Sequence, residues 1–266
     1  MADNIQIFDR SLLKARRDRT QSKFQDYAFL HDWAHKQLQD RLCDIKRDFQ
    51  SKKEFTADDF DSEFEALGLQ NNSLDLTSCV LNLHCVNDLP GVLSQIKAAL
   101  KPDGLFIAAM FGGETLYELR ESLMKAEMDL KDGVSPRVFP FADKQQMGGL
   151  LQRADFALPV VDSEIITVTY DNMFKLMHDL RGMAESNIIH ERSKVNPGKA
   201  FFMKAAEYYQ DKFAEDDGKI VASFEVIFLI GWAPHESQQK PLAPGSAKNR
   251  LADALSTQEI KAGERP

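Results

Sequence analysis

The stretch KPDGLFIAAMFGGETLYELR, residues Lys101 to Arg120, decides the fold of this chain. A Pro-Gly turn leads into a nearly continuous apolar run, Leu105 to Phe111, which is typical of a strand in a parallel sheet covered on both faces. Paired glycines end the run, and an amphipathic helix is expected from Glu114 to Leu130. A strand that turns into a helix in this way presents a ligand-binding edge in α/β folds.

A second block of the same kind lies just upstream, NSLDLTSCVLNLHCVNDLP from Asn72 to Pro90. It predicts a strand centred on Leu76 to Leu83, followed by a helix that starts at an Asp88 N-cap and ends near Leu100. A strand, a helix and a strand within about 40 residues make a right-handed βαβ unit. With a last apolar strand at Phe224 to Trp232, the sequence predicts an α/β fold.

The chain divides into three regions. Residues 1–49 have apolar positions at helical spacing and predict an N-terminal helical cap. Residues 50–240 are expected to form the α/β domain, and residues 241–266 a flexible tail, because this last segment has no sustained apolar face. Within the second region, residues 50–72 are acidic, show no strand period, and are interpreted as a loop with one helical turn.

Composition excludes several functions. A net charge of −8 over 266 residues argues against general binding of nucleic acid, which needs a clustered positive surface. No apolar run reaches the roughly 18 residues needed to span a bilayer, so no transmembrane segment is predicted. The one basic cluster could contact an anionic partner, but a solvated helix face is the favoured interpretation of Lys14, Arg16, Arg17 and Arg19.

No metal site is predicted. The three cysteines show no C-x-x-C spacing, which argues against both a disulfide framework and a zinc knuckle. His31 and His35 have i, i+4 spacing, but neither a H-E-x-x-H glutamate nor a third ligand accompanies them. No nucleophile elbow, P-loop or catalytic triad signature is present either, so no catalytic residue is assigned.

The two blocks resemble strands four and five of class I S-adenosylmethionine (SAM) methyltransferases, with matches at Asp75, His84, Asp88 to Pro90, and Lys101 to Gly104. The runs FGGETLYELR, DLRGMAESN, FEVIFLIGWAPHESQ and FDRSLLKARRDR narrow the resemblance to the methyltransferase-fold assembly factors of respiratory complex I, found in mitochondria and alphaproteobacteria. The resemblance implies a Rossmann-like fold, SAM as the cofactor and a complex I subunit as the partner.

The resemblance breaks between Phe49 and Glu63. Family members have there the first strand, the glycine loop under the cofactor, and the second strand with its ribose-binding acidic residue. Only residues 50–62 fill this stretch here, and no G-x-G occurs in the chain, whereas a βαβ unit takes on the order of 30 residues. We therefore expect a truncated fold with weakened SAM binding. The edge of strand four should then be covered by a partner subunit, a homodimer or the N-terminal helices.

The resemblance also supplies candidate site residues. Glu63 would lie near the adenine amino group, and His84 beside cofactor or substrate. Asn82 is a candidate lining residue, since a regular strand would point it away from the face of its neighbours; for Asn82 and His84 a purely structural role is equally consistent. Contacts with substrate or partner are expected from Glu114, Tyr117, Arg120, Arg181, Glu185 and Asn187.

Two functions follow from these expectations. The first is a cofactor-poor pseudoenzyme, an assembly factor that acts as a binding module for a complex I subunit. Mitochondrial members of the family are associated with arginine hydroxylation on a quinone-module subunit, but the sequence shows no oxidant site. The alternative is an active SAM-dependent methyltransferase, similar to the malonyl-carrier-protein methyltransferases, with a pocket rebuilt from the N-terminal helices and Glu63. The expected location is the bacterial cytoplasm, including the periphery of the inner membrane.

Overall fold

The computed structural model describes residues 6–61, 63–131, 133–239 and 251–258, with the side chains of residues 63, 251 and 254 excepted. Residues up to Pro234 form one compact unit, and residues from His235 onward form a second. In the second unit a short helix, α8, spans Leu251–Ala254. The rest of the predicted tail, residues 241–250 and 259–266, lies outside the described residues.

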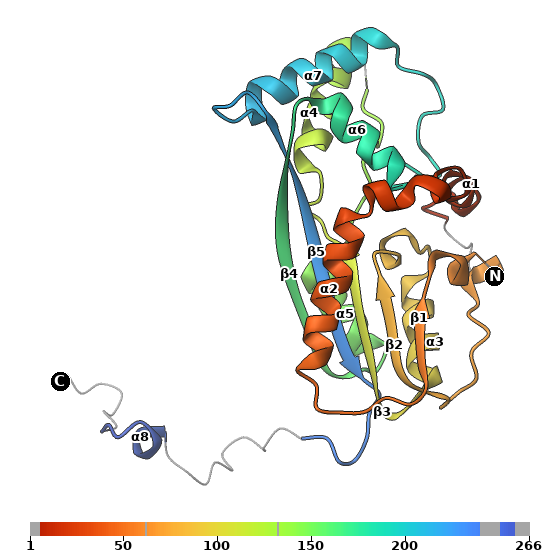
Figure 1. The fold of residues 1–266 in the computed structure, drawn as a ribbon, viewed down its shortest axis with the longest axis vertical. Helices are drawn as coiled ribbons and strands as arrows, with labels where there is room; N and C mark the ends of the chain where they lie inside the picture. Colours follow the sequence, from red (N-terminus) through yellow and green to blue (C-terminus); the bar gives the residue numbers. More distant parts are fainter. Residues whose placement is uncertain (1–5, 62, 132, 240–250, 259–266) are drawn as a thin grey trace. The chain divides into compact units, whose positions relative to one another are not determined.

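The first unit is built on a five-stranded mixed sheet with the strand order β1-β2-β3-β5-β4 (Figure 1). The first three strands run parallel to one another, and β5 runs antiparallel to both of its neighbours. This topology confirms the predicted Rossmann-like α/β class. The strands are β1 Lys52–Phe55, β2 Leu74–Val80, β3 Leu100–Phe111, β4 Ala157–Tyr170 and β5 Ile220–Trp232.

The predicted βαβ unit is confirmed. Helix α3, Leu89–Ala99, connects β2 to β3, with Asp88 as its N-cap accepting a hydrogen bond from Gly91 N–H at 3.0 Å and with proline in its first turn. The other helices are α1 Arg10–Thr20, α2 Phe29–Cys43, α4 Tyr117–Leu130, α5 Lys144–Arg153, α6 Met173–Gly182 and α7 Lys199–Phe213, and the 3-10 helices are η1 Gln21–Tyr27, η2 Ala57–Phe60, η3 Glu63–Glu65 and η4 Leu83–Cys85.

The sheet separates two hydrophobic cores, and β3 contributes to both because its side chains alternate between faces. Leu105 and Ile107 pack in the core that contains buried residues of α2, α4, α6 and α7. Phe106 and Ala108 pack in the core that contains α3 and α5. All four side chains are fully buried. In Figure 1, α2 crosses one face of the sheet while α3 and α5 lie on the other.

The expectation of a loop over residues 50–72 is wrong at its start. Lys52–Phe55 forms β1 and pairs in parallel with Leu76–Cys79 of β2. In a doubly wound sheet of order 3-2-1-4-5-6, the first strand lies beside the fourth. The chain thus fills the first-strand position with four residues of its own, the edge of β2 is covered, and the sheet edge that faces outward is that of β1.

Two predicted boundaries also shift, and both affect candidate residues. The strand expected to reach Leu83 ends at Val80, where Leu81 turns the chain with a left-handed φ of 48°. Asn82 therefore lies after the strand, not on one of its faces. Helix α4 begins at Tyr117, which leaves Glu114 in the preceding turn. Within the described residues, no helix is both long and apolar enough to cross a bilayer.

Candidate functional site

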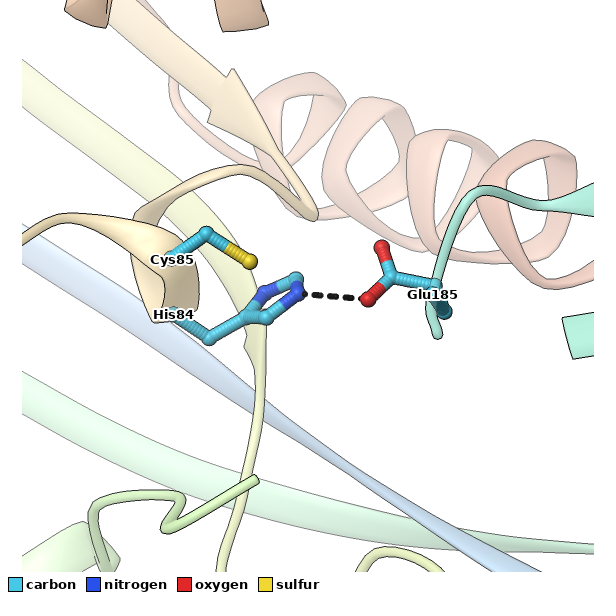
Figure 2. A group of neighbouring side chains, drawn as sticks. All are labelled: His84, Cys85 and Glu185. Atoms are coloured by element: carbon cyan, nitrogen blue, oxygen red, sulfur yellow. Dashed lines mark hydrogen bonds and ion pairs between the residues drawn. The ribbon is translucent and has the colours of Figure 1, made fainter. Parts of the chain in front are cut away.

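A buried ion pair joins the two parts of the chain that carry the predicted site. His84 lies in η4, just past the carboxyl end of β2, and Glu185 lies in the loop after α6. The His84 Nε2 is 3.1 Å from the Glu185 Oε2 (Figure 2). The rings of Phe111, Phe141 and Phe139 surround the imidazole, with centroids 5.0, 5.8 and 6.3 Å away.

The surroundings favour the protonated form of His84. Burial alone would lower the pKa of His84, but the neighbouring Cys85 and the Glu185 carboxylate outweigh burial and raise that pKa to about 10. A protonated imidazole donates a charge-assisted hydrogen bond to the carboxylate. His84 Nδ1, on the opposite side of the ring, is buried and has no hydrogen-bond partner among the described residues.

The larger ligand-sized cavity beside this pair, about 450 Å³, is here named the cationic cavity. Phenylalanine rings, including Phe111 and Phe141, form much of its apolar wall. Glu185 is its one lining carboxylate among the described residues, and that charge is engaged by His84. The basic residues that line it are Arg16, Arg137, Arg181, Arg192 and Lys194.

Only part of this positive charge is neutralised within the chain. Arg137 pairs with Glu127 at 2.6 Å and Arg192 with Asp9 at 3.3 Å. Arg16 donates only to uncharged carbonyls, those of residues 186 and 187 at 2.7 and 2.8 Å. Its pKa is lowered by burial and then by the charges of Arg192 and Arg19, which shows that positive charges repel one another here.

Arg181 and Lys194 are the other two basic residues that line the cationic cavity. Across the described ranges, neither side chain has an ion-pair partner. Three of the five cations are therefore available to an anionic group: the half-buried Arg16 and the exposed Arg181 and Lys194. A charge pair is strengthened by partial burial at Arg16.

A second cavity of about 410 Å³, here named the strand-end cavity, lies at the carboxyl ends of β1 and β2. Residues 56–58 line it after β1, and Asn82 lines it after β2. The N-terminal helices close it with Arg17, Phe24 and His31. Doubly wound folds bind their ligands outside the carboxyl ends of the strands, so this position is the one that corresponds to a cofactor site.

Arg17 brings a buried donor with unused hydrogen-bonding capacity to the strand-end cavity. Its Nη2 donates to Asn82 Oδ1 at 3.2 Å, while its Nη1 is buried without a partner in the described structure. Burial lowers the pKa of Arg17, and the charge of Glu185 opposes that effect. A ligand oxygen placed against Nη1 would satisfy this donor.

The strand-end cavity lacks one feature of a SAM site and keeps another. Among the residues whose placement is described, no glycine lines it, so the close backbone approach of a glycine loop is absent. The carboxylates of Asp18 and Asp58 do line it, and a carboxylate can accept hydrogen bonds from ribose hydroxyls. The neighbouring Asp59 is engaged in a capping box, where it accepts from Thr56 N–H at 2.7 Å and pairs with Lys53 at 2.6 Å.

Two residues line both cavities, Phe111 and Glu185. They stand between the chambers, and the buried His84 lies against both of them. A charged, hydrogen-bonded pair thus forms part of the wall between two spaces, each large enough for a ligand.

Several predicted site residues come together here. Asn82 lines the strand-end cavity and donates to Val80 O at 2.6 Å. Arg181 and Asn187 line the cationic cavity, where the amide of Asn187 donates to Pro136 O at 2.8 Å. Glu185 lines both.

Other predicted residues lie elsewhere. Glu114 is exposed, Tyr117 packs edge-on against Phe213 with centroids 5.9 Å apart, and Arg120 donates to the carbonyls of residues 113 and 115 at 3.0 and 2.9 Å. The structure does not bring these three to the His84 pair. Glu63 belongs to η3, and its side chain lies outside the described residues.

Sequence reasoning missed Arg16, Arg17 and Cys85. The solvated-face interpretation is wrong for both arginines, which are half-buried, although Lys14 and Arg19 are exposed as expected. The sequence did contain a signal for their burial. Arg16 and Arg17 follow the buried Leu13 by three and four residues, so they fall on the same face of the helix. Cys85 carries no local signal, since its burial depends on contacts made by distant segments.

Comparisons with known proteins agree with this architecture. A family model described as a methyltransferase domain matches residues 32–108. The Dictyostelium discoideum protein named "Arginine-hydroxylase NDUFAF5, mitochondrial" is 47% identical over 190 residues, which cover 71% of this chain and 44% of that protein. The Homo sapiens protein of the same name is 46% identical over 187 residues, covering 70% and 53%.

A more distant relative is the malonyl-[acyl-carrier protein] O-methyltransferase of Xylella fastidiosa, 34% identical over 168 residues, covering 63% of this chain and 55% of that protein. The chain thus spans about half the length of the curated relatives it matches. Among solved structures, a SAM-dependent methyltransferase from Thermotoga maritima aligns with a TM-score of 0.42 at 12% identity, covering 83% of this chain and 99% of that one.

The expected location in the bacterial cytoplasm is contradicted by these relatives. The arginine hydroxylases that match at 43–47% identity are designated mitochondrial. The predicted relationship, in contrast, agrees with the matched family model and with these curated relatives. On its sequence similarity the chain is related to the arginine-hydroxylase NDUFAF5 proteins, and its sheet topology is the Rossmann-like one expected of a class I methyltransferase.

Proposed function

We propose that this chain is a methyltransferase-fold assembly factor that binds an acidic segment of a respiratory complex I subunit in the cationic cavity. Its relation to the NDUFAF5 proteins supports a role in complex I assembly. The observation that carries the partner chemistry is the contrast between the whole chain, with a net charge of −8, and this one cavity, lined by five basic side chains.

The chemistry of the cavity favours carboxylates flanked by apolar side chains. Arginine presents paired donors that match a carboxylate in geometry, and Arg16 and Arg181 are not neutralised within the chain. The phenylalanine walls offer area for an apolar or aromatic neighbour. A guanidinium group would instead meet like charges, so we propose that this cavity anchors the partner and does not bind an arginine side chain.

This binding does not depend on SAM in our proposal, which corresponds to the cofactor-poor role expected from the sequence. Support comes from the absence of a glycine among the described lining residues of the strand-end cavity.

Isothermal titration calorimetry with purified quinone-module subunits tests the proposal. Arg181→Glu should raise the dissociation constant about 10- to 100-fold, equivalent to about 1.4 to 2.8 kcal/mol. Lys175→Glu is the matched control, because it makes the same charge change at an exposed position on the same helix. Equal weakening by both variants would mean that only the net charge matters and would overturn the proposal.

The alternative is an active SAM-dependent methyltransferase with a rebuilt pocket. One observation favours it: the strand-end cavity is closed by the N-terminal helices and contains the unpartnered Nη1 of Arg17. SAM titration separates the two functions. Binding at one site per chain, with stabilisation of about 2.7 kcal/mol at 100 times the dissociation constant, would support the enzyme. Absence of heat and of a thermal shift at millimolar SAM would support SAM-independent binding.

A further inference from the structure

Three potential metal ligands meet at the centre of the site. His84 and Cys85 are neighbours in η4, and Glu185 reaches them from the loop after α6, 100 residues further along the chain from Cys85. One ligand atom from each residue lies within 4.8 Å of the other two. Figure 2 shows the imidazole between the thiol and the carboxylate, with all three side chains converging.

The distances suit a tetrahedral ion. Bonds of about 2.0 to 2.3 Å from a zinc ion place neighbouring ligand atoms roughly 3.3 to 3.6 Å apart. The His84 Nε2 and Glu185 Oε2 already stand at 3.1 Å. An ion could therefore replace the hydrogen bond with a small outward movement of the two side chains, while Cys85 Sγ approaches from within the 4.8 Å limit.

His84 is 5% exposed, and its Nδ1 has no hydrogen-bond partner within the described structure. Nδ1 is not the nitrogen that faces Glu185, so the site is argued from the convergence of the three ligand atoms. Cys85 is a free, fully buried thiol, and neither it nor His84 lines the cationic or strand-end cavity in the described residues. A nucleophilic role for the thiol is therefore disfavoured, whereas metal ligation needs no substrate at the sulfur.

We propose that His84, Cys85 and Glu185 bind one divalent transition-metal ion of borderline softness, with Zn²⁺ as the reference ion. The donor set of thiolate, imidazole and carboxylate suits zinc and its neighbours and disfavours magnesium and calcium, which prefer oxygen donors. On binding, the Cys85 thiol and the imidazolium each release a proton to solvent. The thiolate and the carboxylate then balance the two positive charges of the ion.

The local charges are compatible with this site. Arg10 lies against Cys85 but donates to its carbonyl oxygen, at 3.2 Å, and to Asp61 at 2.8 Å. Arg17 lies nearby and is hydrogen-bonded to Asn82. Because the ion and its ligands sum to zero charge, these arginines face a neutral centre. Glu185 also lines both cavities, so a fourth coordination position on its side would open toward them and could hold water.

Co²⁺ titration of the reduced, chelator-treated full chain tests the site directly. We expect one Co²⁺ per chain, a thiolate-to-cobalt charge-transfer band in the near ultraviolet, and loss of that band when Zn²⁺ is added. Cys85→Ser should abolish the band. Cys43→Ser, which removes an exposed cysteine outside the site, is the matched control and should leave it unchanged. Glu185→Gln should keep the band but raise the dissociation constant at least about 10- to 100-fold, the loss typical even of outer-shell partners.

Three results would overturn the proposed metal site. They are the absence of a charge-transfer band in the wild type, a band that survives Cys85→Ser, and a band that disappears in Cys43→Ser. Circular dichroism of the metal-free variants shows whether they are folded. If Cys85→Ser does not fold, Glu185→Gln decides, because it alters a half-buried loop residue and an unchanged dissociation constant would exclude Glu185 as a ligand. Subunit binding is measured separately, so failure of the metal site leaves the proposed function to its own test.

Discussion

Replacing Phe55 by alanine tests whether β1 is an integral strand of the sheet. Phe55 is the last residue of β1, is 1% exposed, and packs against Phe60 with ring centroids 6.0 Å apart. It belongs to the core that also contains α3 and α5. The segment just after it lines the strand-end cavity, so the stability of β1 bears directly on the candidate site.

The expected loss follows from burial. Truncating a fully buried phenylalanine to alanine removes its transfer free energy and leaves a cavity, at a cost of about 3 to 5 kcal/mol. Domain stabilities are typically about 5 to 15 kcal/mol, so Phe55→Ala should remove about a fifth or more of the total. For a domain of this size each kcal/mol lowers Tm by roughly 2 to 4 °C, which predicts a fall of about 6 to 20 °C.

Guanidinium unfolding followed by circular dichroism measures this loss. Phe174→Ala is the control, because Phe174 is 44% exposed on α6 and its truncation should change the free energy of unfolding by less than about 1 kcal/mol. A lower midpoint with an unchanged m-value would assign the effect to native-state packing. If Phe55→Ala were as mild as the control, β1 would not be a packed strand, and the closure of the β2 edge argued above would be refuted.

Two further predictions concern other contacts. Burial would raise the pKa of Glu127, but hydrogen bonds from Arg137 and Ser135 outweigh burial and lower that pKa from 4.5 to about 2. A carboxylate with a lowered pKa stabilises the fold above its unfolded pKa, and this stabilisation is lost as the pH falls toward 2. Glu127→Gln should therefore flatten the decline of Tm between about pH 5 and pH 2, and an unchanged decline would contradict this account. Gly182→Ala should destabilise the fold by about 1 to 3 kcal/mol, because the new Cβ would clash with the Tyr27 ring. Gly149→Ala, which has open space in α5, should stabilise it by up to about 1 kcal/mol. Thermal unfolding of both variants checks the difference, and similar shifts would mean that the Tyr27 ring does not pack against Gly182.

The sequence predicted those parts of the fold whose signals are local. The βαβ unit follows from an apolar run, an Asp88 N-cap and a Pro-Gly turn, each of which acts within a few residues. Strand β1 has no such signal, since Lys52–Phe55 carries three charged residues and a single buried side chain. It is a strand because β2 offers it an unpaired edge, and strand preference depends strongly on such context. The left-handed turn at Leu81 is likewise imposed by its surroundings, as leucine rarely adopts a positive φ.

The site was only partly predictable for a related reason. His84 and Glu185 were each singled out, but their contact spans 101 residues of sequence, and no spacing rule relates positions so far apart. The clearest lesson comes from Arg16 and Arg17. A net charge of −8 describes the chain as a whole, and it disfavours a broad nucleic-acid face. It says nothing about a cavity, where a few half-buried arginines in a low-dielectric wall set the local potential. The net charge of the chain is negative, whereas five of the residues that line the cationic cavity are basic, and it is on this contrast that the proposed anionic partner rests.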